Sequence, residues 1–305
     1  MSIIVTGASG QFGRQAAELL LKKLPASELI LITRKPAALA DYGARGVQVR
    51  YGDFDDPASL ASAFAGGTRM LLISTDQVGG GRLRQHRNAI DAAVAAGIRQ
   101  IAYTSFIGVG PDNPAVSTTE HTATEAMLRE CGVAYTFLRD SQYAESIAQF
   151  ALPGALATGE WMTSAAEGRI ALVSRDDCVA CAVAVVSSAG HDNRIYDITG
   201  PELLSYRDCA MLAAELAGKP IDYQAVSDEE KLAFFDRLGV PRRIEDGMEN
   251  SPIPWPGEEM VSFERAIREG HFAIVSDHVE RLTGRVPKSL REVCLENIDR
   301  LRAVC

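Results

Sequence analysis

The feature that most constrains the fold lies at the start of the chain, where an apolar run turns through glycines into a helical pattern. In the stretch "IIVTGASGQFGRQ", Gly7, Gly10 and Gly13 have the spacing G-x-x-G-x-x-G. Glycine lets the backbone turn tightly and approach a pyrophosphate, while the following helix supplies N–H groups and a positive dipole. A glycine triplet can also be only a turn, but its place at a first strand–helix junction favours dinucleotide binding. The residues predicted to form this loop are Gly7, Ala8, Ser9, Gly10, Gln11, Phe12 and Gly13.

Short apolar runs then alternate with helical patterns through the first half of the chain. Strands are predicted at "ELILITR", "VQVRYGD", "RMLLIST", "RQIAYTS" and "VAYTFLR". Because parallel strands need crossover connections, which are usually helical, this order predicts an α/β fold with a Rossmann-type doubly wound parallel sheet. Helix boundaries are marked by Asp56 and Pro57 at a start and by Gly97 and Gly132 at ends.

After about residue 150 the alternation loosens. "LPGALATGEW" looks like a loop, "RIALVS" and "RIYDIT" look like strands, and three longer segments look like helices. Proline and glycine in "SPIPWPGEE" indicate an irregular excursion. We therefore expect a Rossmann domain over residues 1–150 with a returning segment near 169–199. Residues 200–305 with 151–168 should form a smaller, mostly helical substrate lobe.

Composition narrows the cellular setting. No signal-peptide pattern precedes the first strand and no uncharged apolar run approaches 18 residues, so we expect a cytoplasmic protein without a membrane span. The net charge of −9 opposes direct binding to a phosphate backbone, so no nucleic-acid partner is expected.

The six cysteines are dispersed and no disulfide is predicted. Cys178 and Cys181 have CxxC spacing inside the alanine-valine run "CVACAVAVV", without a second ligand pair. Core packing is therefore favoured over metal or redox work, and no metal is predicted.

The second predicted strand, "LILITRKP", ends in basic residues where an NAD site usually places an acid. Arg34 and Lys35 can form charge-assisted hydrogen bonds with the 2′-phosphate of NADP(H), so NADPH is the favoured cofactor, although solvated loop cations are the alternative. Asp53, at the end of the third strand, lies where the adenine would bind, or else only forms a turn.

Together these segments resemble the NmrA-like branch of the atypical short-chain dehydrogenase/reductases. The resemblance runs nearly end to end, through "IIVTGASGQFG", "IAYTSF", "HTATEAMLRECGVAYTFLRDSQYAES" and "FAIVSDHVERLTGRVPKSLRE". Within the branch, the chain looks most like bacterial NADPH-dependent quinone oxidoreductases and triphenylmethane dye reductases. The resemblance implies that Ser74 and Thr75 line the ribose, that Thr104 and Ser105 face the nicotinamide, and that Tyr143 borders the substrate.

An ordinary short-chain dehydrogenase carries Tyr-x-x-x-Lys in the helix after the fifth strand, and here that spacing holds His121 and Glu125. Hydride addition to a plain ketone leaves a basic alkoxide that needs an acid. A quinone instead gives a phenolate-like anion with a conjugate-acid pKa of about 10, and a cationic triarylmethane dye becomes neutral. We therefore expect a small aromatic or conjugated substrate. Candidates for the lining of its pocket are Phe106, Tyr143, Phe150 and Trp161, although core packing is the favoured role of any single one.

His121 is the one candidate catalytic group. Ser117 and Glu120 fit a capping box, which would place His121 one turn into a helix whose dipole disfavours a charged imidazole. Ala123 and Ala126 should lie on the apolar side of this helix, with His121 on a neighbouring side toward the cleft. By resemblance, His121 also stands where lignan and isoflavone reductases carry their catalytic lysine. Catalysis, substrate orientation and simple exposure remain open.

Three functions fit these residues. The favoured one is an NADPH-dependent reductase of quinones or other planar, conjugated electrophiles. A non-catalytic NAD(P)-binding redox sensor of NmrA type is the first alternative, and a reductase of lignan-like, benzylic ether or aryl enone substrates with His121 as acid is the second. The sequence also leaves a homodimer open.

Overall fold

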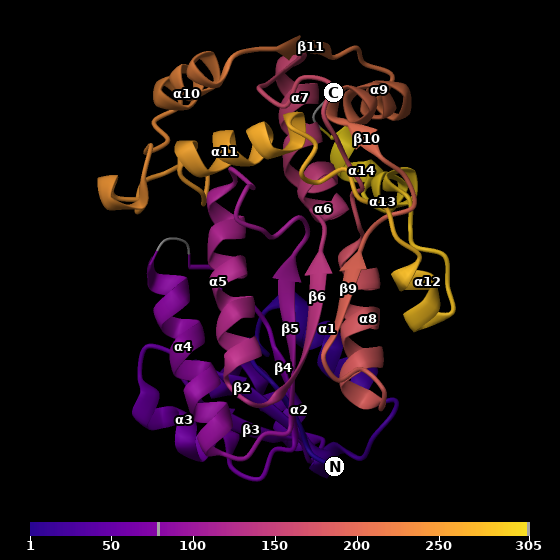
Figure 1. Cartoon of the computed structure of the whole chain (residues 1–305). Helices are drawn as coiled ribbons and strands as arrows, with labels where there is room; N and C mark the ends of the chain where they lie inside the picture. The colour runs from indigo at the N-terminus through magenta and orange to yellow at the C-terminus, as the bar shows by residue number, and fades with distance from the viewer. Residues whose placement is uncertain (78–79, 304–305) are drawn as a thin grey trace.

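The computed structural model describes residues 1–77 and 80–303, and its centre is a seven-stranded parallel sheet (Figure 1). The strands follow the order β3-β2-β1-β4-β5-β6-β9, whose first six members have the Rossmann arrangement. This confirms the predicted fold class. The strands are β1 (Ile3–Val5), β2 (Leu29–Thr33), β3 (Gln48–Tyr51), β4 (Arg69–Leu72), β5 (Gln100–Phe106), β6 (Ala134–Asp140) and β9 (Arg194–Ile198).

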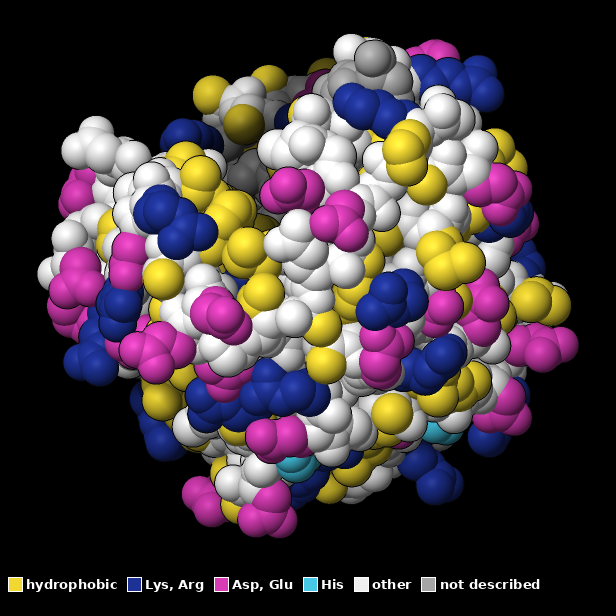
Figure 2. Space-filling view, turned by 90° about the horizontal axis from the view of Figure 1, so that it is seen from above, with side chains coloured by type: hydrophobic (Ala, Val, Ile, Leu, Met, Phe, Trp, Pro, Cys, Tyr) yellow, Lys and Arg dark blue, Asp and Glu magenta, His cyan; other side chains and the backbone are white. Residues whose placement is uncertain are grey.

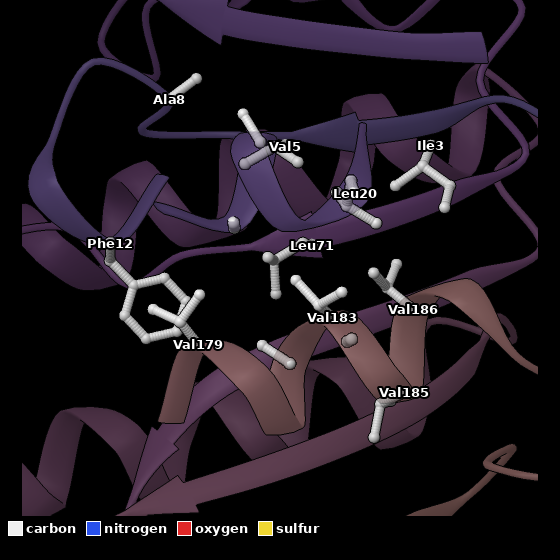
Figure 3. Close-up of a cluster of buried hydrophobic side chains, with 14 of the residues drawn as sticks. Ile3, Val5, Ala8, Phe12, Leu20, Leu71, Val179, Val183, Val185 and Val186 are labelled. Carbon is white, nitrogen blue, oxygen red and sulfur yellow. The ribbon is translucent and has the colours of Figure 1, made fainter. Parts of the chain in front are cut away.

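Helices cover both faces of this sheet. On one face lie α1 (Gln11–Leu20) and α8 (Arg175–Ser187), and on the other α3 (Pro57–Phe64), α4 (Gly80–Ala95) and α5 (Val116–Glu130). Successive strand residues point to opposite faces, so Ile3 and Val5 pack with α1 and α8 while Ile4 packs with α3 and α4. Figure 3 shows the first of these two cores, where valines of α8 meet strand residues.

The run that contains the CxxC pair forms the middle of α8. Cys178 and Cys181 are fully buried in the same core, as their surroundings predict. Among residues 1–77 and 80–303, no group of three or more His, Cys, Asp or Glu side chains is placed to hold a metal ion. No helix in this part of the chain is long and apolar enough to cross a membrane.

A second, mostly helical body sits above the carboxyl ends of the strands (Figure 1). The predicted loop "LPGALATGEW" is wrong in part, because Leu152–Thr158 forms α7, with Pro153 in the first turn and Gly159 at φ +79° ending the helix. Pro153 lies where the π-helical turn η3 (Ile147–Ala151) passes into α7, and an irregular turn of this kind accommodates a residue without an N–H. The segment 251–256 is irregular, as expected. The domain limits themselves stay a prediction.

The remaining elements are short. They are η1 (Ala26–Glu28), η2 (Pro36–Leu39), α2 (Ala40–Ala44), α6 (Ala144–Ser146), η3 (Ile147–Ala151), β7 (Glu160–Thr163), β8 (Arg169–Ile170), β10 (Leu204–Ser205), α9 (Tyr206–Ala217), β11 (Asp222–Ala225), α10 (Asp228–Arg237), η4 (Ile244–Asp246), α11 (Gly257–Arg268), α12 (His278–Thr283), α13 (Leu290–Glu296) and α14 (Ile298–Arg302).

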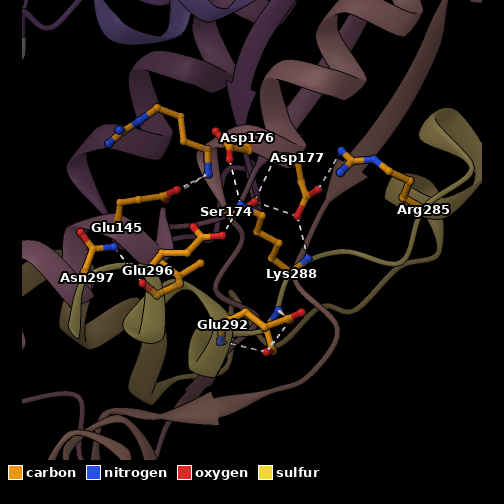
Figure 4. A network of polar contacts seen from close by, with 12 residues as sticks. Glu145, Ser174, Asp176, Asp177, Arg285, Lys288, Glu292, Glu296 and Asn297 are labelled. Carbon is orange, nitrogen blue, oxygen red and sulfur yellow. Dashed lines mark hydrogen bonds and ion pairs between the residues drawn. The ribbon is translucent and has the colours of Figure 1, made fainter. Parts of the chain in front are cut away.

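A polar network fastens the C-terminal segment to the start of α8 (Figure 4). The fully buried carboxylate of Asp177 accepts hydrogen bonds from the Ser174 hydroxyl at 2.7 Å and from the Lys288 N–H at 2.8 Å. The Lys288 ammonium group bonds to Asp176 at 2.9 Å and to Glu296 at 2.7 Å. These bonds place the C-terminal helices over the strand ends, where the site described next is built.

Candidate active site

The glycine loop between β1 and α1 is shaped by close backbone contacts. Gly7 has φ +59°, a conformation that favours glycine. A Cβ atom on Gly13 would lie 2.5 Å from the carbonyl oxygen of Gly7 and 2.6 Å from the Cα of Ala8. Only glycine therefore fits at position 13, which lets helix α1 begin directly against the loop.

The N-terminus of α1 is open to an anion. No side chain of the described residues caps the helix at Gly10, so the first N–H groups of the helix are available to a ligand. The Phe12 ring is buried in the core, and only its backbone faces this end of the helix. Gln11 accepts a 2.7 Å hydrogen bond from Arg175 of α8, and Ser9 accepts one of 3.0 Å from Thr33. The geometry fits a pyrophosphate.

The basic pair follows β2 directly. Arg34 and Lys35 are both exposed, and the Lys35 N–H donates to the Thr33 hydroxyl at 3.1 Å. The pKa of Asp55 is held below its usual value by Arg84 and Gln85, with a smaller effect from Arg34. Arg34 is thus close to the turn that follows β3.

In that turn, Asp53 accepts a 3.0 Å hydrogen bond from the Asp55 N–H. This contact matches the turn-forming alternative considered for Asp53. Its contact with an adenine stays a prediction.

Two hydroxyl groups after β4 are buried at the carboxyl edge of the sheet. The Ser74 N–H donates to the Thr104 hydroxyl at 2.8 Å, and the Thr75 N–H donates to Nε2 of His86 at 3.2 Å. The side-chain oxygens of Ser74 and Thr75 are nevertheless buried without a hydrogen-bond partner among residues 1–77 and 80–303. Buried hydroxyls are normally paired, so these two predict a polar ligand at the end of β4.

A similar pair stands at the end of β6, two strands along the same edge of the sheet. Asp140 Oδ1 and Ser141 Oγ are buried with no hydrogen-bond partner in the residues that the structure describes, while Tyr143 donates its hydroxyl hydrogen to Asp140 Oδ2 at 3.4 Å. Burial raises the pKa of Asp140 to about 8, so its carboxyl group is mostly protonated at neutral pH. The carboxyl ends of β4 and β6 thus offer polar groups that fit the ribose and amide of a dinucleotide. Sequence reasoning missed Asp140, although its place directly after a buried strand was a usable signal.

Helix α5 buries a polar face. It begins at Val116 with Ala115 as N-cap, so the predicted capping box of Ser117 and Glu120 is wrong. Ala126, expected on the buried apolar side, is exposed. The buried positions are instead Thr118, Glu120, His121, Thr124, Glu125 and Leu128.

Arginine side chains from other elements make this polar face possible. Glu120 forms a 3.0 Å ion pair with Arg82 of α4 and so turns away from the start of its own helix. Burial raises the pKa of Glu120 to about 7, although Arg82 acts in the opposite direction. A buried ion pair that crosses between two helices leaves no trace in the periodicity of either one.

Glu125, four residues after His121, is committed to structure. It accepts hydrogen bonds from Nε and Nη2 of Arg139 at 2.9 and 2.7 Å and from the Ser105 hydroxyl at 2.8 Å. Its side chain is almost fully buried. The position that holds lysine in an ordinary short-chain dehydrogenase therefore holds a paired carboxylate here, and the Ser105 hydroxyl points to it.

His121 is buried and uncharged. It is 6% exposed, and its Nδ1 lies 2.8 Å from the Tyr103 hydroxyl oxygen. Burial first, then the charge of Arg82, holds the pKa of His121 well below its usual value. Burial also raises the pKa of Tyr103, so both partners are neutral near pH 7. A neutral imidazole can orient a substrate, but it carries no readily released proton.

Of the four candidate aromatic residues, only Phe106 contacts His121. Its ring centroid lies 6.0 Å from that of His121, 5.7 Å from Phe263 of α11 and 5.5 Å from Phe272. Phe106 thus joins the end of β5 to the upper body of the molecule. Figure 2 shows that body from above, with acidic and basic side chains interspersed over its surface.

The other three aromatic candidates lie apart from this cluster. Trp161, 8% exposed, stacks on Tyr206 at 5.2 Å inside the core of the upper body. Phe150 is 67% exposed, with the Arg300 guanidinium 5.9 Å from its ring. Tyr143 lies at the end of β6, with the Arg175 guanidinium 5.2 Å from its ring. Their contacts with substrate stay predictions.

Comparison with known proteins agrees with the geometry. Residues 7–192 match the NAD(P)H-binding family model. Quinone oxidoreductase 2 of Escherichia coli (strain K12) is 38% identical over 251 residues, which cover 82% of this chain and 87% of that protein.

Solved structures are similar over nearly the whole chain. The E. coli NADPH-dependent quinone oxidoreductase in complex with NADPH superposes with a TM-score of 0.87 at 34% identity, covering 96% of this chain and 99% of the other. The Citrobacter sp. triphenylmethane reductase gives a TM-score of 0.85 at 31% identity, covering 98% and 100% of the two chains.

The fold and the site thus define a dinucleotide-dependent enzyme of Rossmann type. The chain belongs to the NAD(P)H-binding family, among its NmrA-like reductases, and is an NAD(P)H-dependent oxidoreductase. This confirms the family predicted from the sequence.

Proposed function

We propose that the protein is an NADPH-dependent reductase of quinones or other planar, conjugated electrophiles. The observation that carries the proposal is the state of helix α5, where His121 is buried and neutral and Glu125 is paired with Arg139. Neither residue of the Tyr-x-x-x-Lys spacing is available as a proton donor. Such a site suits acceptors whose reduced form needs little help from an acid.

The choice of NADPH over NADH is supported by Arg34. Its exposed guanidinium follows β2, where the 2′-phosphate of a bound cofactor would lie. We propose Arg34 and Lys35 as the phosphate-binding pair, and the N-terminus of α1 as the pyrophosphate site. The relatives named for NADPH, quinone and triphenylmethane reduction support the same reading.

When bound, NADPH supplies a hydride, and the chain supplies the position of the acceptor. We propose that Phe106 and Phe263 line the acceptor site on the side of the upper body and limit the access of water. His121, held by Tyr103, orients the acceptor by hydrogen bonding and remains neutral throughout. Reduction of a quinone leaves a phenolate that takes its proton from solvent, because its conjugate acid has a pKa of about 10.

A panel of acceptors tests the proposal. Purified protein is mixed with NADPH and 1,4-benzoquinone, 1,4-naphthoquinone, a cationic triarylmethane dye or cyclohexanone, and the NADPH absorbance is followed. We expect consumption with the quinones and the dye and none with the ketone. Binding of NADPH without consumption by any acceptor would instead support a redox sensor. The proposal includes a cytoplasmic location, which the free cysteines of the described chain fit.

A further inference from the structure

We infer that His86 is a positioning residue, which holds the turn after β4 so that the Ser74 and Thr75 hydroxyls face the cofactor. The inference rests on the proposed function, since it assigns part of the NADPH site. His86 lies in the middle of α4 and has no predicted role in the sequence. Its ring is fully buried, with 0% exposure.

The hydrogen bonds of His86 fix its tautomer. Thr75 donates its N–H to Nε2 at 3.2 Å, so Nε2 must be an acceptor. The ring hydrogen is therefore on Nδ1, which lies 3.0 Å from the Thr124 hydroxyl. Thr124 cannot donate in return, because its own hydrogen is donated to the Glu120 carbonyl at 2.9 Å. The chain of donors runs in one direction, from Thr75 through His86 and Thr124 to Glu120.

His86 remains neutral at any ordinary pH. Burial, with a smaller effect from Arg82, lowers its pKa to about 3. Protonation would put a hydrogen on Nε2, directly opposite the Thr75 N–H. The hydrogen bonds require the tautomer with its hydrogen on Nδ1, and burial keeps the ring in this neutral form.

Hydrogen bonds hold three backbone groups of the turn. Thr75 is bound at its N–H by His86 and at its carbonyl oxygen by Nε of Arg82, at 3.2 Å. The Ser74 N–H is bound by Thr104 at 2.8 Å. The buried oxygens of Ser74 and Thr75, which have no hydrogen-bond partner in the described part of the chain, are then the groups left to bind a ligand.

His86 also links this turn to the helix that carries His121. Its ring packs edge-on against Tyr103, with centroids 5.4 Å apart, and Tyr103 contacts His121 through its hydroxyl. Its Nδ1–H bond to Thr124 ends on α5, one turn beyond His121. One imidazole therefore bonds both to α5 and to the cofactor turn.

Two isosteric variants separate the roles of the ring nitrogens. Gln places its Oε1 as many bonds from Cα as Nε2 of histidine, so His86→Gln keeps an acceptor for Thr75. His86→Asn is one bond shorter and reaches only toward Thr124. Both variants bury a neutral amide, so they form a matched pair. His191→Asn is the control, because His191 lies beside Ser188 and Tyr196 at the opposite end of the sheet, bonded through both ring nitrogens.

Three properties are measured. They are the NADPH dissociation constant by calorimetry, the KM for NADPH and the kcat with 1,4-naphthoquinone as acceptor, and the rate of amide hydrogen exchange at Thr75 without cofactor. For His86→Asn we expect a dissociation constant and a KM for NADPH raised about ten- to a hundredfold, because a buried N–H loses its acceptor. The kcat should stay within about threefold, and the Thr75 amide should exchange faster. His86→Gln should restore NADPH affinity to within about threefold of the parent, and His191→Asn should leave it unchanged.

Equal NADPH dissociation constants for His86→Asn, His86→Gln and the parent protein would overturn the inference while leaving the proposed function intact. A parent protein that binds no NADPH would overturn both. Should His86→Asn fail to fold, Thr75 amide exchange in His86→Gln decides, since exchange as slow as in the parent is expected and fast exchange contradicts the inference.

Discussion

The hydroxyl oxygen of Tyr103 lies 2.8 Å from Nδ1 of His121, and both side chains are buried. Both groups are also neutral near pH 7, because burial lowers the pKa of the histidine and raises that of the tyrosine. His121, which stands in place of the usual catalytic tyrosine, is therefore a neutral ring held in position by Tyr103. Several measurable consequences depend on this pair and its surroundings.

Replacing His121 by glutamine should lower kcat with 1,4-naphthoquinone by less than about tenfold. Glutamine can still donate a hydrogen bond, and the proposed reaction draws no proton from this position. The pH dependence of kcat between pH 5.5 and 8.5 should also have the same shape in the parent protein and in His121→Gln. A drop in kcat of a hundredfold or more, the usual effect of losing a general acid, would restore the reading of His121 as an acid.

Replacing Arg34 by serine should weaken NADPH binding by roughly ten- to a hundredfold, because a charge-assisted hydrogen bond contributes about 1.5–3 kcal/mol. NADH binding should change little, since NADH lacks the 2′-phosphate. Calorimetric titration of both cofactors measures the two constants. Lys35→Ser, measured in the same way, shows which of the two cations contributes more to NADPH affinity. If Arg34→Ser weakens NADH and NADPH binding equally, Arg34 does not recognise the 2′-phosphate.

Replacing Gly13 by alanine should destabilise the protein by about 1–3 kcal/mol, because the new Cβ would overlap backbone atoms of the glycine loop. NADPH affinity should fall as well, since the loop must move. Gly43→Ala is the matched control, because a Cβ there meets no atom within 4 Å. Urea unfolding of both variants provides the comparison, and equal stability of the two would contradict the close approach.

The free energy of unfolding of Asp140→Asn, compared with that of the parent protein, should increase as the pH rises. The pKa of Asp140 is about 8 in the folded state and about 3.9 when unfolded, so the folded state holds the extra proton between these values. The stability of the parent protein should therefore fall, relative to Asp140→Asn, by about 1.4 kcal/mol per pH unit from pH 4 to pH 8.

Unfolding free energies of the two proteins at pH 5, 6, 7 and 8 give this difference directly. The difference should stop growing above pH 8, where Asp140 ionises in both states. A constant difference from pH 5 to pH 8 would show that Asp140 is already ionised in the folded protein.

The sheet could be predicted from the sequence because its evidence is local. Each buried strand is a short apolar run, and the spacing of the glycines in residues 7–13 indicates a tight strand-to-helix turn. The order of strands then follows from the alternation with helices.

The polar face of α5 could not be predicted in this way. The burial of Glu120 and Glu125 has no local signal, because the arginines that neutralise them, Arg82 and Arg139, lie on other elements. His86 was hidden for the same reason, since its acceptor role depends on the backbone of Thr75. Periodicity records which residues are apolar, and a buried ion pair or hydrogen bond between distant segments does not alter it.

The candidate aromatic residues illustrate a related limit. Phe106 directly follows a predicted strand and Trp161 ends a segment predicted as a loop. In the structure both lie in strands, yet one meets His121 and the other packs against Tyr206. Which face of a short strand turns toward the cleft depends on the body above the sheet, and the order of that body's helices was only partly visible in the sequence.

The central claim is that hydride passes directly from NADPH to an acceptor that needs no proton. The most direct test uses NADPH deuterated at C4, in separate 4R and 4S forms, with a cationic triarylmethane dye and analysis of the product by mass spectrometry. We predict one deuterium on the central carbon of the dye from one of the two forms and none from the other. Product without deuterium from either form, or no product while NADPH remains bound, would contradict the account.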